Sequence, residues 1–420
     1  MSGPGTLDVL LLGLNYAPEP SGIAPYTTGL AEGLSRKGHR VRVLTSFPHY
    51  PHWSYQGDVA RTTVQDRNGV RVERHRHYVP QNPRSVNRAL FELAYGMRVA
   101  GRRWGTPDVI LSVSPALLSS ALFFARARAQ PSSPALGLII QDIYSSGLGE
   151  TGARGGPLSR LMMAVEARTA RAADGVAVIH ERFASQVVER LHVSRDRIDV
   201  IRNWTHVPAV TNLDRRAFRR SMRWPDSEII VLHAGAMGVK QGLENVVDAA
   251  ALADAQHQPV RFVLLGDGGQ RTALEARAAG VQRIEFLDHL DDDSFTRALA
   301  SADVLLVNER PGVREMAVPS KLTTYFNAAK PVLAATESDS TTTHEVLAAS
   351  AGICVPPGRP AALVAGALLI AADEEAAVKM GERGRRYATD ILSQERAIDS
   401  YESWIRKLVA RRQGSLNPQG

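Results

Sequence analysis

The chain is 420 residues long, and its 44% hydrophobic and 22% charged residues fit a globular protein of two domains better than a single domain. Its formal net charge of +7 favours anionic partners, but no interleaved aromatic and basic motif of the kind that reads RNA is evident, so we expect no nucleic-acid partner. The only cysteine, Cys354, excludes an internal disulfide framework, and the sequence has neither a signal peptide nor an apolar stretch long enough to span a bilayer, which predicts a cytoplasmic protein.

In the first half of the chain, short aliphatic runs alternate with helix-like segments. Near-continuous aliphatic strands between helices indicate a parallel sheet covered on both faces. The strands are predicted over residues 8–14, 41–47, 70–75, 109–113, 135–142, 175–179 and 199–201. The helices are predicted over residues 24–37, 84–102, 117–128, 157–173 and 181–191.

A second series with the same alternation follows, and we place a linker between the two series, within the polar, proline-containing residues 204–226. Its strands are predicted over residues 229–233, 260–265, 284–288, 304–307, 332–335 and 353–355. Its helices are predicted over residues 244–255, 270–279, 291–300, 320–329, 341–349, 360–372 and 374–387, and a last helix over 393–411. Open parallel sheets bind ligands at the carboxyl ends of their strands, so functional residues are expected there.

Glycine and acidic residues mark the candidate sites of the first half. Gly22 follows the first strand, and without a Cβ it lets backbone N–H groups approach a phosphate, although a plain strand-to-helix turn also explains it. Asp142 ends a predicted strand, where a carboxylate faces a ligand rather than the core; the alternative is a helix cap. Glu166 lies in the middle of a predicted helix, where a solvated helix face explains it at least as well as a functional role.

The stretch over residues 318–334 is the most informative part of the second half. Pro319 is a favoured first helical residue, and Ser320 and Lys321 then lie at the positive end of the helix, where free N–H groups attract an anion. This arrangement predicts a cradle for a diphosphate, against the alternative of an ordinary helix start. The run Gly266-Asp267-Gly268-Gly269 also resembles a glycine-rich nucleotide loop, without the full dinucleotide spacing.

Four segments, in this order and spacing, resemble glycosyltransferase family 4, the retaining sugar transferases of the GT-B fold: residues 8–24, 38–45, 233–244 and 318–334. The similarity is greatest to bacterial transferases of the colanic-acid type, which add sugars during exopolysaccharide assembly. The resemblance implies an α/β fold with two doubly wound Rossmann-like domains facing a central cleft. It places an acceptor-side domain over 1–205, a nucleotide-sugar-binding domain over 206–392, and a helix that returns to the first domain, with a tail, over 393–420.

The resemblance also implies site residues. Asp142 would lie close to the transferring sugar as the catalytic group, and Asn15 and Asn203 would contact the acceptor or form a hinge. The phosphate-binding arginine of the family is Ala236 here, and its basic partner falls on Gln241. The donor would be bound by Gly22, Gly235, Lys240, Gln241, Asp267, Glu315, Pro319, Ser320, Lys321 and Thr324.

The paired glutamates of the family are replaced as well. The first falls on Met316, next to Glu315, and the second, which usually binds the donor ribose, falls on Thr324. The function implied is retaining transfer from a nucleotide-diphosphate sugar to a lipid-linked or saccharide acceptor, with no cofactor and no metal. Two alternatives compete with it: a nucleotide-sugar 2-epimerase on the same fold, and a non-catalytic partner subunit, which the missing glutamates suggest.

The last helix carries Trp404 and aliphatic residues beside four basic residues. Basic residues are attracted to an anionic membrane surface, so this composition predicts reversible docking on the inner face of the membrane. The alternative is that the helix packs on the first domain and leaves only its basic face outward. The four basic residues are Arg406, Lys407, Arg411 and Arg412.

Overall fold

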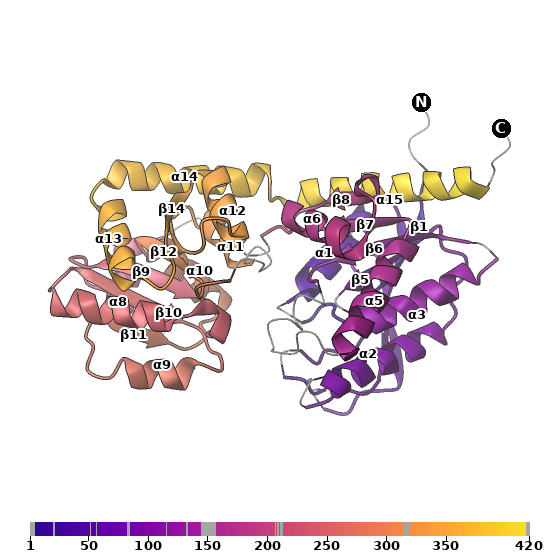
Figure 1. Ribbon diagram of the computed structural model, residues 1–420, viewed down its shortest axis with the longest axis horizontal. Helices are drawn as coiled ribbons and strands as arrows, with labels where there is room; N and C mark the ends of the chain where they lie inside the picture. Colours follow the sequence, from indigo (N-terminus) through magenta and orange to yellow (C-terminus); the bar gives the residue numbers. More distant parts are fainter. Residues whose placement is uncertain are drawn as a thin grey trace. The chain divides into compact units, whose positions relative to one another are not determined.

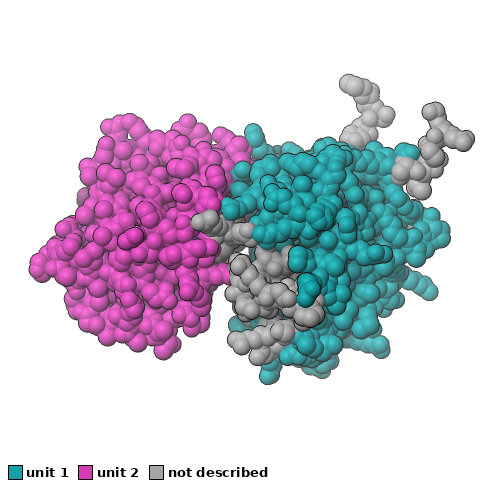
Figure 2. Space-filling model, viewed as in Figure 1, with its two compact units in different colours: residues 1–203, 394–420 teal, residues 204–393 magenta. Residues whose placement is uncertain are grey.

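The computed structural model describes most of the chain, and the described part forms two compact units (Figure 2). The first unit contains residues 1–203 and 394–420, and the second contains residues 204–393. The residues not described are 1–4, 20–21, 51, 56, 82–84, 115, 132, 144–156, 206, 208–209, 211–212, 314–319 and 417–420.

A sheet of mostly parallel strands forms the centre of the first unit (Figure 1). Its strands are β1 (Asp8–Leu12), β2 (Arg40–Ser46), β3 (Thr62–Arg67), β4 (Val70–His75), β5 (Val109–Ser114), β6 (Ala135–Ile140), β7 (Gly175–Val178) and β8 (Ile198–Val200). They lie in the order β3-β4-β2-β1-β5-β6-β7-β8. The edge strand β3, which pairs with β4 in antiparallel orientation, is not among the predicted strands, because its sequence is mostly polar. Its last four residues are exposed.

Helices cover both faces of this sheet. They are α1 (Ala24–Arg36), α2 (Ser85–Ala100), α3 (Leu117–Arg128), α5 (Pro157–Ala172), α6 (Glu181–Leu191) and α15 (Gln394–Leu416). Helices α2, α3, α5 and α6 lie side by side in that order, and α1 packs beside α15. Glu166 on α5 is only 4% exposed, so of the two explanations given for it the solvated helix face is wrong.

The last helix, α15, is part of the core of the first unit. Trp404 and Leu408 are each 1% exposed, and Ile405 is fully buried. A Cβ on Gly137 of β6 would lie 2.7 Å from the Trp404 ring, and one on Gly175 of β7 would lie 2.6 Å from Leu408. Of the two alternatives for this helix, packing on the first domain is therefore the one observed.

The basic residues of α15 also bind groups of the first unit. Lys407 Nζ lies 3.2 Å from a carboxylate oxygen of Asp199, and Arg411 donates to the carbonyl of Asp196 (3.2 Å). Arg406 donates to Glu402 (2.8 Å), one turn earlier in the helix. These charges therefore stabilise the position of the helix, in addition to any role at the surface.

A second parallel sheet forms the centre of the other unit. Its strands are β9 (Ile229–Ala234), β10 (Val260–Leu265), β11 (Ile284–Leu287), β12 (Val304–Asn308), β13 (Val332–Ala335) and β14 (Gly352–Val355), in the order β11-β10-β9-β12-β13-β14. Its helices are α7 (Arg215–Ser221), α8 (Glu244–Ala255), α9 (Arg271–Arg277), α10 (Asp292–Ser301), α11 (Ser320–Asn327), α12 (Thr341–Ala349), α13 (Pro360–Ala371) and α14 (Glu374–Asp390).

Both faces of this second sheet are buried. Ile230 and Leu232 of β9 enter one hydrophobic cluster, whereas Val231 between them enters another. This alternation confirms the predicted architecture of two doubly wound α/β units. Helix α7 occupies part of residues 204–226, the range in which the linker was placed, and it is capped by Asp214, which accepts the N–H of Ala217 (2.9 Å). In the described part of the chain, no helix is both long and apolar enough to cross a membrane.

Candidate functional site

Two glycine-rich loops lie side by side at the carboxyl ends of β9 and β10. The N–H of Gly235 donates to the carbonyl of Leu265, and the N–H of Met237 donates to that of Asp267, both at 2.8 Å. A Cβ on Gly266 would lie 2.3 Å from the carbonyl oxygen of Gly235, and both glycines have a φ of 130°. Only glycine fits this contact, so Gly266 allows the two loops to pack backbone against backbone.

Asn308, the last residue of β12, holds the loop that follows β9. Its Nδ2 donates to the carbonyls of Gln241 (2.7 Å) and Gly242 (2.9 Å), and its Oδ1 accepts from Asn245 (2.8 Å). Asn308 is 1% exposed, and its hydrogen bonds link the end of β12 to the loop that follows the neighbouring strand β9. It is not among the residues predicted from the sequence, although a polar residue that closes an aliphatic strand is a usable signal.

Three predicted donor ligands lie on these loops, in different situations. The side chain of Gln241 turns back into its own loop, where Oε1 accepts the N–H of Gly238 (3.1 Å). The carboxylate of Asp267 is exposed and accepts the N–H of Gly268 (2.7 Å). Lys240 is exposed, and among the three it alone carries a positive charge.

Lys321, in the first turn of α11, reaches the same strand ends from a separate element. Its Nζ lies 3.4 Å from Nε2 of His233 and would lie 3.6 Å from a Cβ on Gly235. Burial lowers the pKa of the Lys321 ammonium to about 8, and the charge of Glu309 opposes this shift. Burial and the charge of Lys321 hold the pKa of His233 well below its usual value, so the neutral imidazole accepts from the ammonium.

Glu309 provides the nearby negative charge. It follows β12 directly, is 3% exposed, and accepts a hydrogen bond from the Thr342 hydroxyl (2.6 Å). Burial raises the pKa of this carboxyl, while the Thr342 hydrogen bond and Lys321 lower it. A lysine, a neutral histidine and a buried carboxyl from three separate elements thus surround the end of β9.

The remaining predicted donor residues fall on α11 or just before it. Thr324 lies one turn after Lys321 and is 8% exposed. Ser320 begins the helix, and only its backbone is described. Glu315 and Pro319 lie outside the described residues. Among the described residues, no group of three or more His, Cys, Asp or Glu side chains could hold a metal ion.

In the first unit, Asp142 and Asn203 come close to the same strand end. Asp142 is exposed just beyond β6. Its neighbour Gln141 is 8% exposed and accepts a hydrogen bond from Nδ2 of Asn203 (2.8 Å). Two predicted residues that are distant in sequence therefore share the carboxyl end of β6.

Asn15 lies beyond β1 and is held by a buried carboxylate. Its Nδ2 donates to Oε2 of Glu19 (2.8 Å), whose Oε1 accepts the N–H groups of His49 (2.8 Å) and Tyr50 (3.0 Å). Gly22 has a φ of 67°, and a Cβ there would lie 3.4 Å from the Tyr50 ring. Gly22 therefore allows the turn into α1, which fits the structural alternative given for it.

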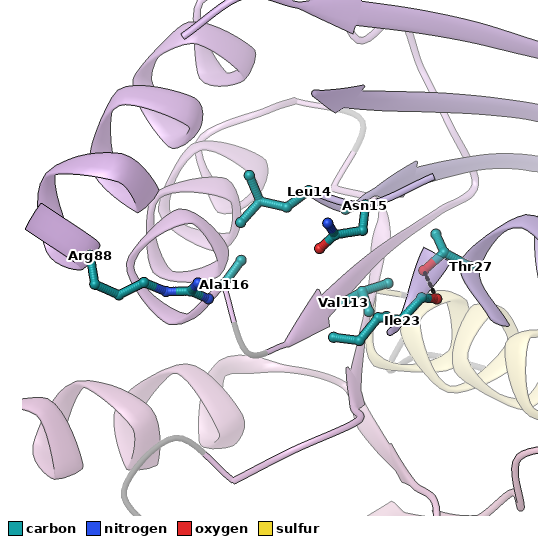
Figure 3. Close-up of a pocket in the computed structure, with 8 residues that line it drawn as sticks. Leu14, Asn15, Ile23, Thr27, Arg88, Val113 and Ala116 are labelled. Atoms are coloured by element: carbon teal, nitrogen blue, oxygen red, sulfur yellow. Dashed lines mark hydrogen bonds between the residues drawn. The ribbon is translucent and has the colours of Figure 1, made fainter. Parts of the chain in front are cut away.

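A small pocket opens at the carboxyl ends of β1 and β5, beside Asn15 (Figure 3). Arg88 of α2 points into it and forms part of its lining. No sequence pattern singled out Arg88, since one arginine on a helix usually indicates a solvated face. The residues that line the pocket are Gly13, Leu14, Asn15, Ile23, Thr27, Arg88, Val113 and Ala116.

Known protein families match both units of the chain. Residues 21–204 match the family described as "Glycosyl transferase 4-like domain", and residues 214–387 match "Glycosyl transferases group 1". WcaI of Escherichia coli K12, a glycosyl transferase named for colanic acid biosynthesis, is 31% identical over 420 residues, covering 95% of this chain and 100% of the relative. A GDP-mannose-dependent alpha-(1-6)-phosphatidylinositol dimannoside mannosyltransferase of Mycobacterium tuberculosis H37Ra is 33% identical over 156 residues, covering 36% and 37%.

Solved structures resemble the chain over nearly its whole length. Sucrose-phosphate synthase of Thermosynechococcus elongatus matches with a TM-score of 0.73 at 18% identity, covering 96% of this chain and 100% of that one. HepE of Anabaena in complex with UDP matches with a TM-score of 0.70 at 14% identity, covering 96% and 100%. At these identities the likeness concerns the fold.

Proposed function

Because the chain belongs to glycosyltransferase family 4 and has the GT-B fold, we propose that it transfers a sugar, with retention of anomeric configuration, from a nucleotide-diphosphate sugar to a lipid-linked or saccharide acceptor. The reaction belongs to cell-surface polysaccharide biosynthesis. The observation that carries the proposal is the position of Lys321 beside Gly235 at the end of β9. No cofactor and no metal take part.

The donor diphosphate binds the second unit, against the loop after β9. The family's arginine is replaced by Ala236, and the side chain of Gln241 is engaged with Gly238, so neither supplies a cation. Lys321 supplies the cation from α11, next to Gly235, whose backbone is open to the ligand. An ammonium fixed in place stabilises the negative charge that develops on the leaving phosphate. HepE, a neighbour in fold, has been solved with UDP.

The acceptor binds the first unit at the carboxyl ends of β1, β5 and β6. Asp142, exposed beyond β6, orients the acceptor hydroxyl or stabilises positive charge on the sugar ring. Asn203 and Asn15, each held by a hydrogen bond, contact the acceptor. The acceptor class is drawn from the relatives, of which one is named for colanic acid biosynthesis and another for a phosphatidylinositol dimannoside. A lipid-linked acceptor places the enzyme in the cytoplasm at the inner face of the membrane.

Product analysis with radiolabelled donors tests this proposal. UDP-, GDP- and ADP-sugars are first ranked by thermal shift, since a ligand at a hundred times its Kd stabilises the folded state by about 2.7 kcal/mol. The best donor is then incubated with a glycolipid extract, and the anomeric configuration of the product is determined by NMR. Label on the glycolipid with retained configuration is expected. Isomerised donor would instead identify an epimerase, and bound but unreacted donor a non-catalytic subunit.

A further inference from the structure

We propose that the pocket beside Asn15 binds an anionic group of the acceptor, a phosphate or a carboxylate, through the guanidinium of Arg88. The inference rests on the proposed function, because it specifies the chemistry of the acceptor. It concerns the first unit alone. The donor is proposed to bind the second unit, so each site can be tested separately.

The guanidinium of Arg88 is held in one orientation. Its Nε donates to Oε1 of Glu92 (3.0 Å), and its Cζ lies 5.5 Å from the ring centroid of Trp53 and 5.3 Å from that of Phe91. Within the described residues, neither terminal amino group of Arg88 has a hydrogen-bond partner. Two adjacent N–H donors are thus available at the pocket, which is the geometry that a phosphate or carboxylate accepts in pairs.

The ion pair with Glu92 does not fully neutralise the positive charge of Arg88. Glu92 is fully buried, and its second oxygen accepts the N–H of Leu118 (3.0 Å) in the first turn of α3. The positive end of that helix therefore stabilises part of the Glu92 charge. Arg88 still presents positive potential to the pocket, although it forms an ion pair along α2.

The rest of the pocket does not oppose an anion. No acidic side chain is among its lining residues, which are all described. The nearest buried carboxylate behind Asn15 is Glu19, and both of its oxygens already accept hydrogen bonds. An anionic oxygen beside Arg88 would therefore meet two donors, and the two carboxylates behind it, Glu92 and Glu19, already accept hydrogen bonds on both of their oxygens. The pocket is small, so it admits an oxygen of such a group rather than a whole sugar.

Calorimetric titration with inorganic pyrophosphate tests the inference. Two sites per chain are expected in the wild-type protein, one at Arg88 and one at Lys321. The double variant Arg88→Met with Glu92→Gln should lose one site, with at least about a tenfold loss of affinity, the change expected when charge-assisted hydrogen bonds are removed. The Glu92→Gln change avoids an unpaired buried carboxylate, so the variant should fold.

Two further variants separate this site from the donor site. Lys321→Met should remove only the other pyrophosphate site, and Arg103→Met, at an exposed arginine of the same unit, should remove neither. If the Arg88 variant keeps the wild-type isotherm, or if wild-type protein binds no pyrophosphate outside Lys321, the inference is overturned. A loss confined to the Arg88 variant would support it while contradicting the donor assignment.

Competition then identifies the source of the anion. Geranyl diphosphate that displaces pyrophosphate from the Arg88 site in the Lys321→Met protein would assign a lipid diphosphate. Displacement by glucuronate would assign a sugar carboxylate. If neither displaces it, the pocket is not an acceptor site, and the proposal fails.

Discussion

The Nζ of Lys321 lies 3.4 Å from Nε2 of His233, although 88 residues separate them in the sequence. The contact joins the first turn of α11 to β9 and places a cation beside the open backbone of Gly235. Because His233 is fully buried and neutral, it accepts a hydrogen bond from the ammonium without competing for a phosphate.

Replacing Lys321 with methionine should weaken donor binding and leave the fold intact. Methionine keeps the apolar part of the side chain and removes the charge. Loss of a hydrogen bond to a charged group costs about 1.5–3 kcal/mol, which corresponds to an increase in Kd of roughly 10- to 150-fold. Calorimetry with the preferred nucleotide sugar measures it. Lys240→Met is the matched comparison. A larger increase in Kd for this variant would assign the phosphate contact to the exposed Lys240 instead of Lys321.

Donor affinity should decrease as the pH rises through about 8. The pKa of Lys321 in the free protein is lowered to about 8 by burial, and a bound diphosphate favours the protonated form, so binding is strongest below this pH and weakens above it. The Kd measured between pH 7 and pH 9.5 should rise by up to about tenfold per pH unit above the pKa.

Lys330 provides the control for this pH dependence. Burial also lowers the pKa of Lys330 to about 8. This residue precedes β13, so it lies at the amino end of the parallel strands, whereas the glycine-rich loops lie at their carboxyl end. Lys330→Met should therefore keep the pH profile of donor binding, whereas Lys321→Met should abolish it. A profile that persists without Lys321 would assign the titration to another group.

Asp142→Asn should lower turnover much more than donor affinity. The substitution removes charge and keeps volume, so it tests the electrostatic role alone. Removal of one electrostatic contact in an active site typically lowers kcat by about 10²–10³-fold. Asp58→Asn, at a side chain that is 96% exposed, is the control and should leave turnover unchanged. A decrease of less than about twofold, or under ~0.5 kcal/mol, would show that Asp142 is not catalytic.

Gly175→Ala should destabilise the first unit. A Cβ there would lie 2.6 Å from Leu408, so α15 must shift, and overpacking of this kind costs about 1–3 kcal/mol of unfolding free energy. Gly414→Ala, on the same helix with no atom within 4 Å of the new Cβ, should instead stabilise the helix by about 0.5–1 kcal/mol. Urea unfolding of both variants measures the difference, and equal stabilities would argue against close packing of α15.

Treatment with EDTA should leave transfer activity unchanged. We expect Lys321 and the start of α11 to meet the charge of the leaving diphosphate, so removal of divalent ions should not raise the barrier. Initial rates before and after chelation, with and without added Mg²⁺, provide the measurement. A loss of activity that Mg²⁺ restores would contradict the expectation.

The fold could be predicted from the sequence because short, mainly aliphatic runs such as that of β10, alternating with helix-like segments, indicate parallel strands buried on both faces. The edge strand β3 could not be predicted in this way, since its residues are mostly polar and its last four are exposed to solvent. Helix α7 was also missed, because its basic sequence carries the composition of a linker.

The site was predicted only in part, because several of its residues meet through contacts between segments that are distant in the sequence. Helix-start chemistry is local, so Lys321 could be proposed as an anion ligand from neighbouring residues alone. Its approach to His233 depends on the packing of α11 against β9, which no local pattern encodes. The same holds for Arg88, because only the folded chain brings this residue of α2 to the pocket at the carboxyl ends of β1 and β5. The side chain of Gln241 was predicted to face the donor, and its hydrogen bond to Gly238 depends on the turn geometry.

The membership of α15 in the first unit has a consequence for synthesis on the ribosome. Residues 394–420 belong to the same compact unit as residues 1–203, whereas the unit between them, residues 204–393, is continuous in sequence. The side of the sheet at Gly137 and Gly175 lacks its cover until Trp404 and Leu408 have left the exit tunnel. The domain that is translated first is therefore completed last, and a chain truncated before residue 394 exposes an apolar surface that the full-length protein buries.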